Sequence, residues 1–459
     1  MYTLPKDTKI TNQILNDVIA YNEKYKERFE MLENYYLGKH DILERAKDDR
    51  LSNNKVVVNH AKYITDTNVA YLLGNPVDYQ TNNGDHDIQP ILDAYKKQTI
   101  NDLDSEIAKD VSVFGMQYEY VYANQDSEPR SCELDNKNTV IVYDDTVEHN
   151  KLFGLNYRPI YKGEDLDYWE IIYADANEKR VYKSYTDRLT QEGQSEPHAF
   201  GAVPFICYKN NPEILGDFES VISLIDAYNL LQSDRINDKE QLVDAILCLY
   251  GMDFDTEQAE MLHESRMIAN IPADGKIEYL VKTLQENDVD VLRKTLESDI
   301  HKISMVPNMS DENFVGNSSG VAIRYKLLAF EQNIKNKERY MEKGLMERFQ
   351  LYNNFLFTKS QMSEVPIEDV DAVFKRNLPS NDFEISQMIN NLADYVDTET
   401  LITQLSFIKD ASEIVKLKQK EDESKPKSPY DLAFGKNEIP DANKKDEEET
   451  DEEETVPEE

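Results

Sequence analysis

The stretch SGVAIRYKLLAFEQNIKNKERYMEKGLMERFQLYNNFLF, Ser319 to Phe357, decides the architecture of this chain. Its apolar side chains recur every three or four residues, which is the spacing of one face of an α-helix. That face consists of Ile323, Leu327, Phe330, Ile334, Met341, Leu345, Phe349, Tyr352 and Leu356. With Ser318 or Ser319 as N-cap, about forty residues form a helix roughly 60 Å long.

A helix of that length is too long for one small domain, so we expect packing partners along its whole length. A coiled coil, a repeat array or a ring of subunits would supply them. The sequence shows no internal repeat of fixed period, which disfavours the repeat array.

The N-terminal half predicts an α+β unit that ends near Gly216. Three helices are expected, over residues 8–36, 59–73 and 100–114, and Asn59 is a good N-cap for the second. An extended run over residues 55–58 precedes that helix. Short runs rich in β-branched and aromatic residues then predict an antiparallel meander. Its strands are residues 117–122, 139–143, 152–161, 168–173 and 179–185.

The C-terminal half predicts mostly helices. One helix is expected within residues 217–243 and another within 287–304, where Pro307 ends it. Between them we expect a strand at 245–252, a helix at 256–265 and a strand pair formed by 267–271 and 277–281. Two amphipathic helices follow at 382–396 and 399–418, and the charged residues 419–459 are expected to be disordered. The fold class is therefore α+β and predominantly helical.

The charge of the chain restricts its partners. The formal net charge is −38, of which residues 441–459 contribute −9, so the remainder carries −29. Proteins that bind DNA tightly normally show a basic face, and none is visible in the sequence. The acidic tail is read first as a solubilising segment, with partner binding or DNA mimicry as the alternative. An acidic wall that repels phosphate remains compatible with the composition.

Cysteines and hydropathy indicate a soluble protein of a reducing compartment. The three cysteines lie far apart, which argues against a disulfide framework and against paired-cysteine metal sites. No segment approaches eighteen uninterrupted apolar residues, so we expect no membrane span. The N-terminal residues lack the apolar core of a signal peptide.

Motifs for catalysis are weak, and we expect no enzymatic activity, cofactor or metal. The sequence has no phosphate-binding glycine loop followed by lysine and no dinucleotide fingerprint. Gly316-Asn317-Ser318-Ser319-Gly320 fits the pattern of a serine-hydrolase elbow, but a buried strand should precede the serine. Here a polar stretch precedes it, so helix capping is the simpler explanation. A serine hydrolase at Ser318 stays as a remote alternative.

Two motifs resemble the siphophage-type portal proteins of tailed double-stranded DNA bacteriophages. The first is Asn53-Asn54-Lys55-Val56-Val57-Val58-Asn59-His60-Ala61-Lys62, followed by Tyr71-Leu72-Leu73-Gly74-Asn75-Pro76-Val77. The second runs from Val306-Pro307 through Asp311-Glu312-Asn313-Phe314 and Gly316-Asn317 to Ser319-Gly320-Val321-Ala322-Ile323-Arg324-Tyr325-Lys326. The order of the expected elements matches that family over nearly the whole chain, except for the acidic tail.

The resemblance implies a portal-type fold that assembles into a ring, commonly of twelve subunits, at one capsid vertex. By position, residues 1–216 with the later part of 319–378 would be the wing, 217–243 and 287–304 the stem helices, and 244–286 the clip. Residues 305–318 would be the tunnel loop, 379–418 the crown and 419–459 a variable tail. Implied partners are double-stranded DNA, the terminase large subunit, capsid and scaffolding proteins, and a head-completion protein.

The resemblance also suggests which side chains meet DNA. The tunnel-loop candidates are Asn308, Ser310, Asp311, Glu312, Asn313 and Phe314. Sparse phosphate contacts are expected from Lys294, His301 and Lys302, whose alternative role is that of ordinary solvated helix charges. The main rival function is a cytoplasmic helical scaffold or adaptor that handles no DNA.

Overall fold

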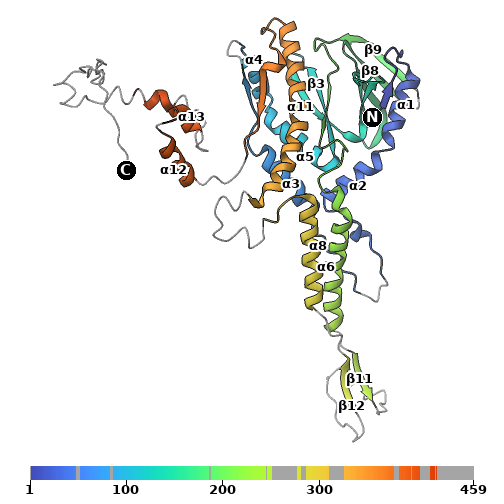
Figure 1. Ribbon diagram of the computed structural model, residues 1–459. Helices are drawn as coiled ribbons and strands as arrows, with labels where there is room; N and C mark the ends of the chain where they lie inside the picture. The colour runs from blue at the N-terminus through green and yellow to red at the C-terminus, as the bar shows by residue number, and fades with distance from the viewer. Residues whose placement is uncertain are drawn as a thin grey trace, which may run out of the picture. The chain divides into compact units, whose positions relative to one another are not determined.

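The computed structural model describes residues 2–47, 52–82, 86–185, 188–243, 246–250, 276–280, 286–309, 325–376, 382–393, 395–403, 414–418 and 420. The chain divides into two units. Unit 1 comprises residues Met1–Leu378 and unit 2 comprises Pro379–Glu459. Figure 1 shows both units with their elements labelled.

The largest sheet of unit 1 has six strands in the order β1-β5-β6-β7-β8-β9. Four consecutive connections make β5 to β9 an antiparallel meander, and β1 joins its edge in parallel. The strands are β1 Tyr2–Leu4, β5 Thr139–Asp144, β6 Lys151–Lys162, β7 Asp165–Ala174, β8 Glu178–Ser184 and β9 Leu189–Pro197. Apolar side chains of β5 to β9 pack against Leu15 and Val18 of α1.

Three smaller sheets complete the strands of the described residues. A three-stranded sheet has the order β10-β3-β4, and two pairs are β13-β2 and β11-β12. Their bounds are β2 Asp78–Thr81, β3 Met116–Ala123, β4 Pro129–Leu134, β10 Phe205–Lys209, β11 Ile246–Tyr250, β12 Lys276–Leu280 and β13 Val370–Val373. Residues 117–122 therefore belong to a second sheet, and the single meander expected from the sequence is wrong at this strand.

The helices of unit 1 mostly follow the expected positions. Their bounds are α1 Asn12–Glu23, α2 Lys26–Tyr36, α3 His60–Leu73, α4 Gln89–Lys97, α5 Ile100–Phe114, α6 Ile222–Val243, α8 Glu286–Ser304 and α11 Leu328–Thr358. The expected single helix over residues 8–36 is wrong, because Lys24 and Tyr25 separate α1 from α2. Asn59 caps α3 as expected, since its side chain accepts a hydrogen bond from the Lys62 amide.

The apolar face of α11 is buried inside its own protomer. Phe330 and Ile334 pack in one core with α2, α3 and the start of α6. Residues from Met341 to Leu356 pack in a second core with α4, α5 and Val370 of β13. The expectation that this helix requires partners from outside is therefore wrong, because one body supplies two successive cores along it. Residues 319–324 lie outside the described residues.

Between α6 and α8 the structure describes one antiparallel strand pair. β11 pairs with β12, with Ile246 opposite Leu280. The expected partner for residues 277–281 was 267–271, and that pairing stays a prediction. Residues 267–271 and the expected helix at 256–265 lie outside the described residues.

Unit 2 contributes two described helices, α12 Asp382–Leu392 and α13 Thr398–Thr403, and residues 414–418 are helical as well. The expected helix over residues 382–396 ends four residues early. Leu401 is buried, whereas Tyr395 is 85% exposed. Residues 421–459, which hold the acidic tail, lie outside the described residues.

Candidate functional site: a helix pair and its junction with the body

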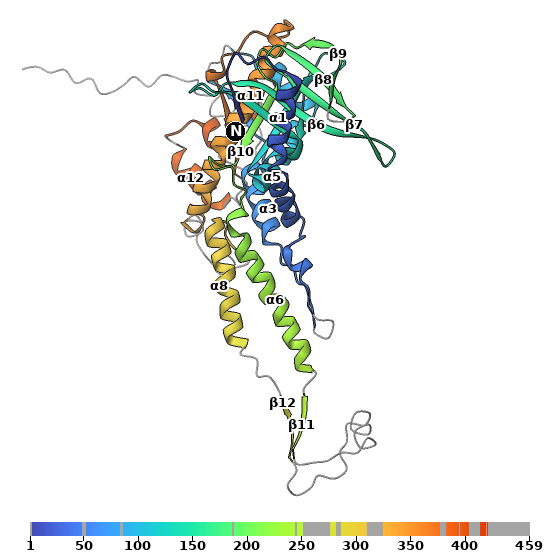
Figure 2. The same ribbon diagram turned by 90° about the vertical axis from the view of Figure 1, so that its right-hand side faces the viewer.

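Helices α6 and α8 lie side by side in both ribbon views and extend away from the rest of unit 1 (Figures 1 and 2). We call them the helix pair, and we call residues 2–221 with 325–376 the body. Large apolar side chains on the pair remain exposed: Leu230 at 45%, Ile236 at 41%, Val291 at 64% and Leu292 at 49%. Among the described residues of unit 1, nothing covers them. The helix pair therefore presents apolar surface that the described residues of unit 1 do not bury.

The inner side of α6 is polar. Asn229, Ser233 and Asn237 follow one another at four-residue spacing and are almost fully buried. Their side-chain oxygens accept hydrogen bonds from the amides of Val58 at 2.8 Å, Val56 at 2.9 Å and Asn54 at 2.7 Å. We call this the amide ladder, and it consists of those three side chains and the extended segment of residues 54–58.

The amide ladder explains why residues 54–58 form no sheet. An extended strand needs an acceptor for every second amide, and a neighbouring strand normally supplies it. Here the side chains of a helix replace that neighbouring strand. The ladder therefore ties the helix pair to the segment that leads into α3.

The start of α6 is fixed by a buried ion pair. Asp217 and Lys337 are 4% and 6% exposed, and the Lys337 Nζ lies 2.5 Å from Asp217 Oδ2. Lys337 also donates to the Ser112 hydroxyl at 2.7 Å, and Asn68 donates to Asp217 at 2.7 Å. A buried ion pair loses its hydration, and it is stable only where further hydrogen bonds satisfy its remaining donors and acceptors. The bonds to Ser112 and Asn68 provide them here. They join α3, α5 and α11 at the point where α6 begins.

Histidines gather where α3, α6 and α8 meet. The ring of His60 lies edge-on to Tyr228 of α6 and to His301 of α8, with centroid distances of 4.9 and 5.8 Å. Burial lowers the pKa of His60 to about 4, and His301 adds to the effect. His40 accepts a hydrogen bond from the Asn229 side-chain amide at 2.8 Å and donates one to the Tyr35 carbonyl at 2.9 Å, and burial lowers its pKa as well. Neutral imidazoles therefore belong to the packed form of this junction.

The comparison with protein families identifies the molecule. Residues 15–427 match the family described as phage portal protein, SPP1 Gp6-like. The chain belongs to the phage portal protein family. The match includes both motifs on which the sequence resemblance rests, and it covers the helix pair and the junction.

Two portal proteins are similar to this portal protein over long stretches. The portal protein of Bacillus phage SPP1 is 24% identical over 415 residues, which are 83% of this chain and 80% of the relative. The portal protein of Clostridium phage phiCD119 is 22% identical over 228 residues, or 48% of this chain and 49% of the relative. The resemblance proposed from the sequence is thereby confirmed at the level of the family.

The candidate tunnel loop is described only at its beginning. Asn308 is half-buried and donates to Glu297 Oε1 at 2.9 Å, so it is held against α8 in this portal protein. Ser310, Asp311, Glu312, Asn313 and Phe314 lie outside the described residues, as does Ser318. Their expected roles stay predictions.

The three candidate phosphate contacts lie on α8 in different settings. Lys294 is exposed and forms an ion pair with Asp290 at 2.8 Å. Lys302 is exposed near the body. His301 is half-buried, bonds the Val306 carbonyl at 2.9 Å and packs against His60 and Tyr63. His301 is therefore part of the junction, which the sequence reasoning did not foresee.

Sequence reasoning missed the amide ladder. The N-terminal part of α6 buries Ile225 and Tyr228, but further along the helix Ile236 is exposed and the buried positions hold Asn229, Ser233 and Asn237. Polar residues recurring every four positions in a helix were the available signal. In the part of the chain that the structure describes, no helix is long and apolar enough to cross a membrane, and no three potential ligands gather for a metal ion.

Proposed function

We propose that this portal protein assembles into a ring whose central channel passes double-stranded DNA. The observation that carries the proposal is the exposed apolar surface of the helix pair. Removing such side chains from water contributes roughly 25 cal/mol per Å², and the four that the described residues of unit 1 leave exposed would gain this from a neighbouring copy. Copies arranged around an axis would cover the surface on every protomer.

The charge of the chain supports a channel that holds DNA weakly. Every lysine fixed against a phosphate adds binding that must be undone as the DNA moves. On α8, the charge of Lys294 is already balanced by Asp290, and the chain carries a net charge of −38. An acidic wall with few free cations lets a motor push DNA past it without trapping each phosphate.

The parts of the chain then take roles by analogy with the family. Residues 1–216 and the later part of 319–378 act as wing, α6 and α8 as stem, and 244–286 as the clip that meets the terminase large subunit and later a head-completion protein. Residues 305–318 act as tunnel loop and 379–418 as crown. The ring resides at one capsid vertex of the virion, after assembly in the host cytoplasm, and acts without catalysis or a cofactor.

The experiment for ring formation is a mass measurement of the purified chain at several salt concentrations, together with electron microscopy. A closed ring, with about twelve protomers and a hole wide enough for a DNA duplex, is expected. A species that stays monomeric at every salt concentration, or an open helical assembly, would contradict the proposal and favour the scaffold or adaptor function.

A second experiment addresses the tunnel loop. Deletion of residues 310–318 should preserve the ring and abolish DNA packaging, because Val306, whose side chain is fully buried in the core of the body, stays in place. Normal packaging by the deletion variant would exclude the role of the loop. An ester-hydrolysis assay that compares the wild type with Ser318→Ala tests the remote hydrolase alternative.

A further inference from the structure

A groove lies between α11, the C-terminal end of α8 and the loop of residues 210–220. Its cavity volume is about 840 Å³. The buried pair of Asp217 and Lys337 lies at its floor, so the groove is built on a fixed part of the body.

One wall of the groove is basic. Lys335, Arg339 and Lys343 lie at four-residue spacing on the exposed side of α11, and the latter two line the groove. None of the three forms an ion pair with a described residue. Glu213 and Glu342 also line the groove. Burial raises the pKa of Glu342, and the charges of Glu338 and Asp371 raise it further. In a chain this acidic, a row of unpaired cations is unusual.

The opposite rim of the groove is apolar. Leu215, Ile303 and Met305 are 41%, 50% and 51% exposed, and all three line the cavity. An apolar rim facing a basic wall suits a protein surface that carries both apolar and acidic side chains. It does not suit a DNA backbone, which offers phosphates and no apolar counterpart.

A ridge with the complementary character exists on the same chain. It comprises residues 25–44, which include α2 and the short helix η1, Asp41–Glu44. Its exposed apolar side chains are Tyr25 at 40%, Met31 at 36%, Leu37 at 57% and Leu43 at 36%.

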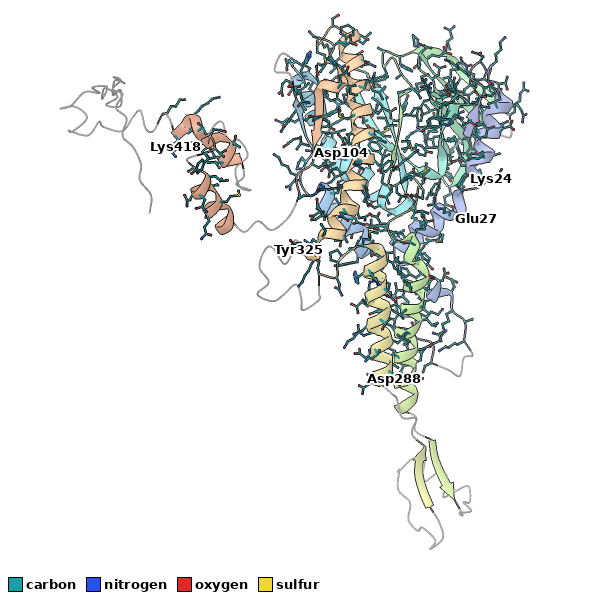
Figure 3. All side chains as sticks on the ribbon, in the orientation of Figure 1. Lys24, Glu27, Asp104, Asp288, Tyr325 and Lys418 are labelled. Carbon is teal, nitrogen blue, oxygen red and sulfur yellow. The ribbon has the colours of Figure 1, made fainter. Side chains whose placement is uncertain are left out.

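The ridge is also acidic. Glu27, Glu30 and Glu44 are exposed and form no ion pair among the described residues, and they outnumber the exposed Lys39. Figure 3 labels Glu27 on the side of the body away from α11.

We propose that the α2–η1 ridge of one protomer binds in the α11 groove of the next. The inference rests on the proposed ring and names the surfaces that close it. Groove and ridge are different patches of one chain, so their contact is head-to-tail, and a head-to-tail contact closes into a ring when the rotation allows it. The cations of α11 meet the carboxylates of α2, while Met31 and its neighbours cover the rim at Ile303 and Met305.

A self-associating chain with a net charge of −38 particularly needs such local complementarity. Copies of it repel one another at long range. Opposite charges placed across the contact offset that repulsion locally and fix the orientation of the two copies. A second copy is therefore the occupant that the charges favour.

Charge reversal tests the contact. Arg339→Glu with Lys343→Glu should raise the protein concentration needed for ring formation about tenfold or more, because like charges then face each other. Glu27→Lys with Glu30→Lys should have a similar effect. The quadruple variant restores the net charge and the complementarity, so it should assemble again near the wild-type concentration. Lys96→Glu with Lys162→Glu, two exposed lysines elsewhere, is the matched control.

The outcomes separate this inference from the ring itself. If wild-type protein forms no ring, the proposed function fails. Suppose instead that the wild type forms rings. If the double variants then assemble like the control, or if the quadruple variant assembles as poorly as the double variants, the ring stands and the groove contact is wrong. If the basic-row variant instead loses only DNA retention in intact rings, the row binds DNA and the contact is likewise wrong.

A second readout does not depend on charge. In a chain with Met31→Cys and Ile303→Cys, a short bis-maleimide reagent should link successive protomers into a ladder of covalent oligomers. The single-cysteine variants serve as controls, because they also contain the three native cysteines, Cys132, Cys207 and Cys248. A ladder no stronger than in those controls would overturn the contact.

Discussion

The centre of the body and the helix pair place polar and apolar side chains in opposite ways. In the body, the apolar face of α11 is buried and the charges buried beside it are paired within the protomer. In the helix pair, the buried side of α6 is polar from Asn229 onward, and the apolar side chains Leu230, Ile236, Val291 and Leu292 are exposed. The difference indicates that the centre of the body is complete within one chain, while the outer side of the helix pair is shaped for neighbours.

The charged centre of the body shows how completely its polar groups are satisfied. Arg348 is fully buried and donates to Glu119 at 2.7 Å and to Asp104 at 2.5 Å. Tyr208 donates to Glu119 at 2.6 Å. Gly344, one turn before Arg348, leaves room for the Tyr208 ring, since a Cβ there would lie 2.3 Å from it. Four elements, α5, β3, β10 and α11, are joined by this one cluster.

The largest effect is expected from breaking that centre. Arg348→Met leaves Asp104 and Glu119 buried without their partner, so the free energy of unfolding should fall by about 3–5 kcal/mol. Chemical denaturation followed by fluorescence measures the loss. Arg339→Met, an exposed arginine on the same helix, should change it by no more than about 0.5 kcal/mol. Equal effects of the two variants would remove the contrast between buried and exposed charge.

The histidine junction should make stability depend on pH. The pKa of His60 falls from 6.5 to about 4 on folding, so below pH 6.5 the unfolded chain binds a proton that the folded chain excludes. Stability is therefore full above pH 6.5 and declines as the pH falls towards 4. Between pH 7.5 and 5, wild type should lose about 2 kcal/mol relative to His60→Phe.

The control for the pH experiment is His149→Asn, which changes an exposed histidine. It should follow the wild type across the same range, because an exposed ring is solvated in both states. If His60→Phe also followed the wild type, the junction would not be the source of the acid sensitivity.

The amide ladder should contribute less per rung. Ser233→Ala leaves the Val56 amide buried without an acceptor, which costs about 1–3 kcal/mol. The expected signature is local: hydrogen exchange of residues 54–58 should accelerate more than exchange in α5. Ser223→Ala, an exposed serine on the same helix, is the control. Uniform acceleration across the body would mean that the ladder is not a separate cooperative element.

The smallest effect on the single chain is expected at the outer side of the helix pair. Val291→Ser with Leu292→Ser should alter the unfolding free energy of the monomer by about 0.5 kcal/mol or less, because both side chains are already exposed. Ring formation should nevertheless weaken. Ile300→Ser, on the buried side of α8, should destabilise the monomer by several kcal/mol. If Val291→Ser with Leu292→Ser lowered the unfolding free energy of the monomer as much as Ile300→Ser, the outer side of the helix pair would be packed within the protomer.

The sequence predicted the elements whose signal is local. The face of α11 from Leu327 to Leu356 is buried as expected, and α3 and α5 start and end close to the expected residues. The strands of the meander were found where β-branched and aromatic residues cluster. β9 was missed because LTQEGQSEP has almost no apolar residue and lies exposed at the edge of the sheet.

The site was harder to predict because its contacts join distant segments. The amides of residues 54–58 find their acceptors more than 170 positions later, and no periodicity in either segment reveals the pairing. The length of α11 likewise suggested external partners, since the sequence does not show that two cores follow one another along a single helix. The family motifs located the important segments without giving these contacts.

The spacing of the hydrogen bonds in the amide ladder limits the length over which a helix can take the place of a neighbouring strand. Four residues of helix advance about 6.0 Å, whereas two residues of strand advance about 6.6 Å. The two periods drift apart by roughly 0.6 Å at each step, so three rungs stay within bonding range and a fourth or fifth would fall out of phase. Lengthening α6 by whole turns would therefore not add rungs to the amide ladder. The extended segment must separate from α6 after about three rungs.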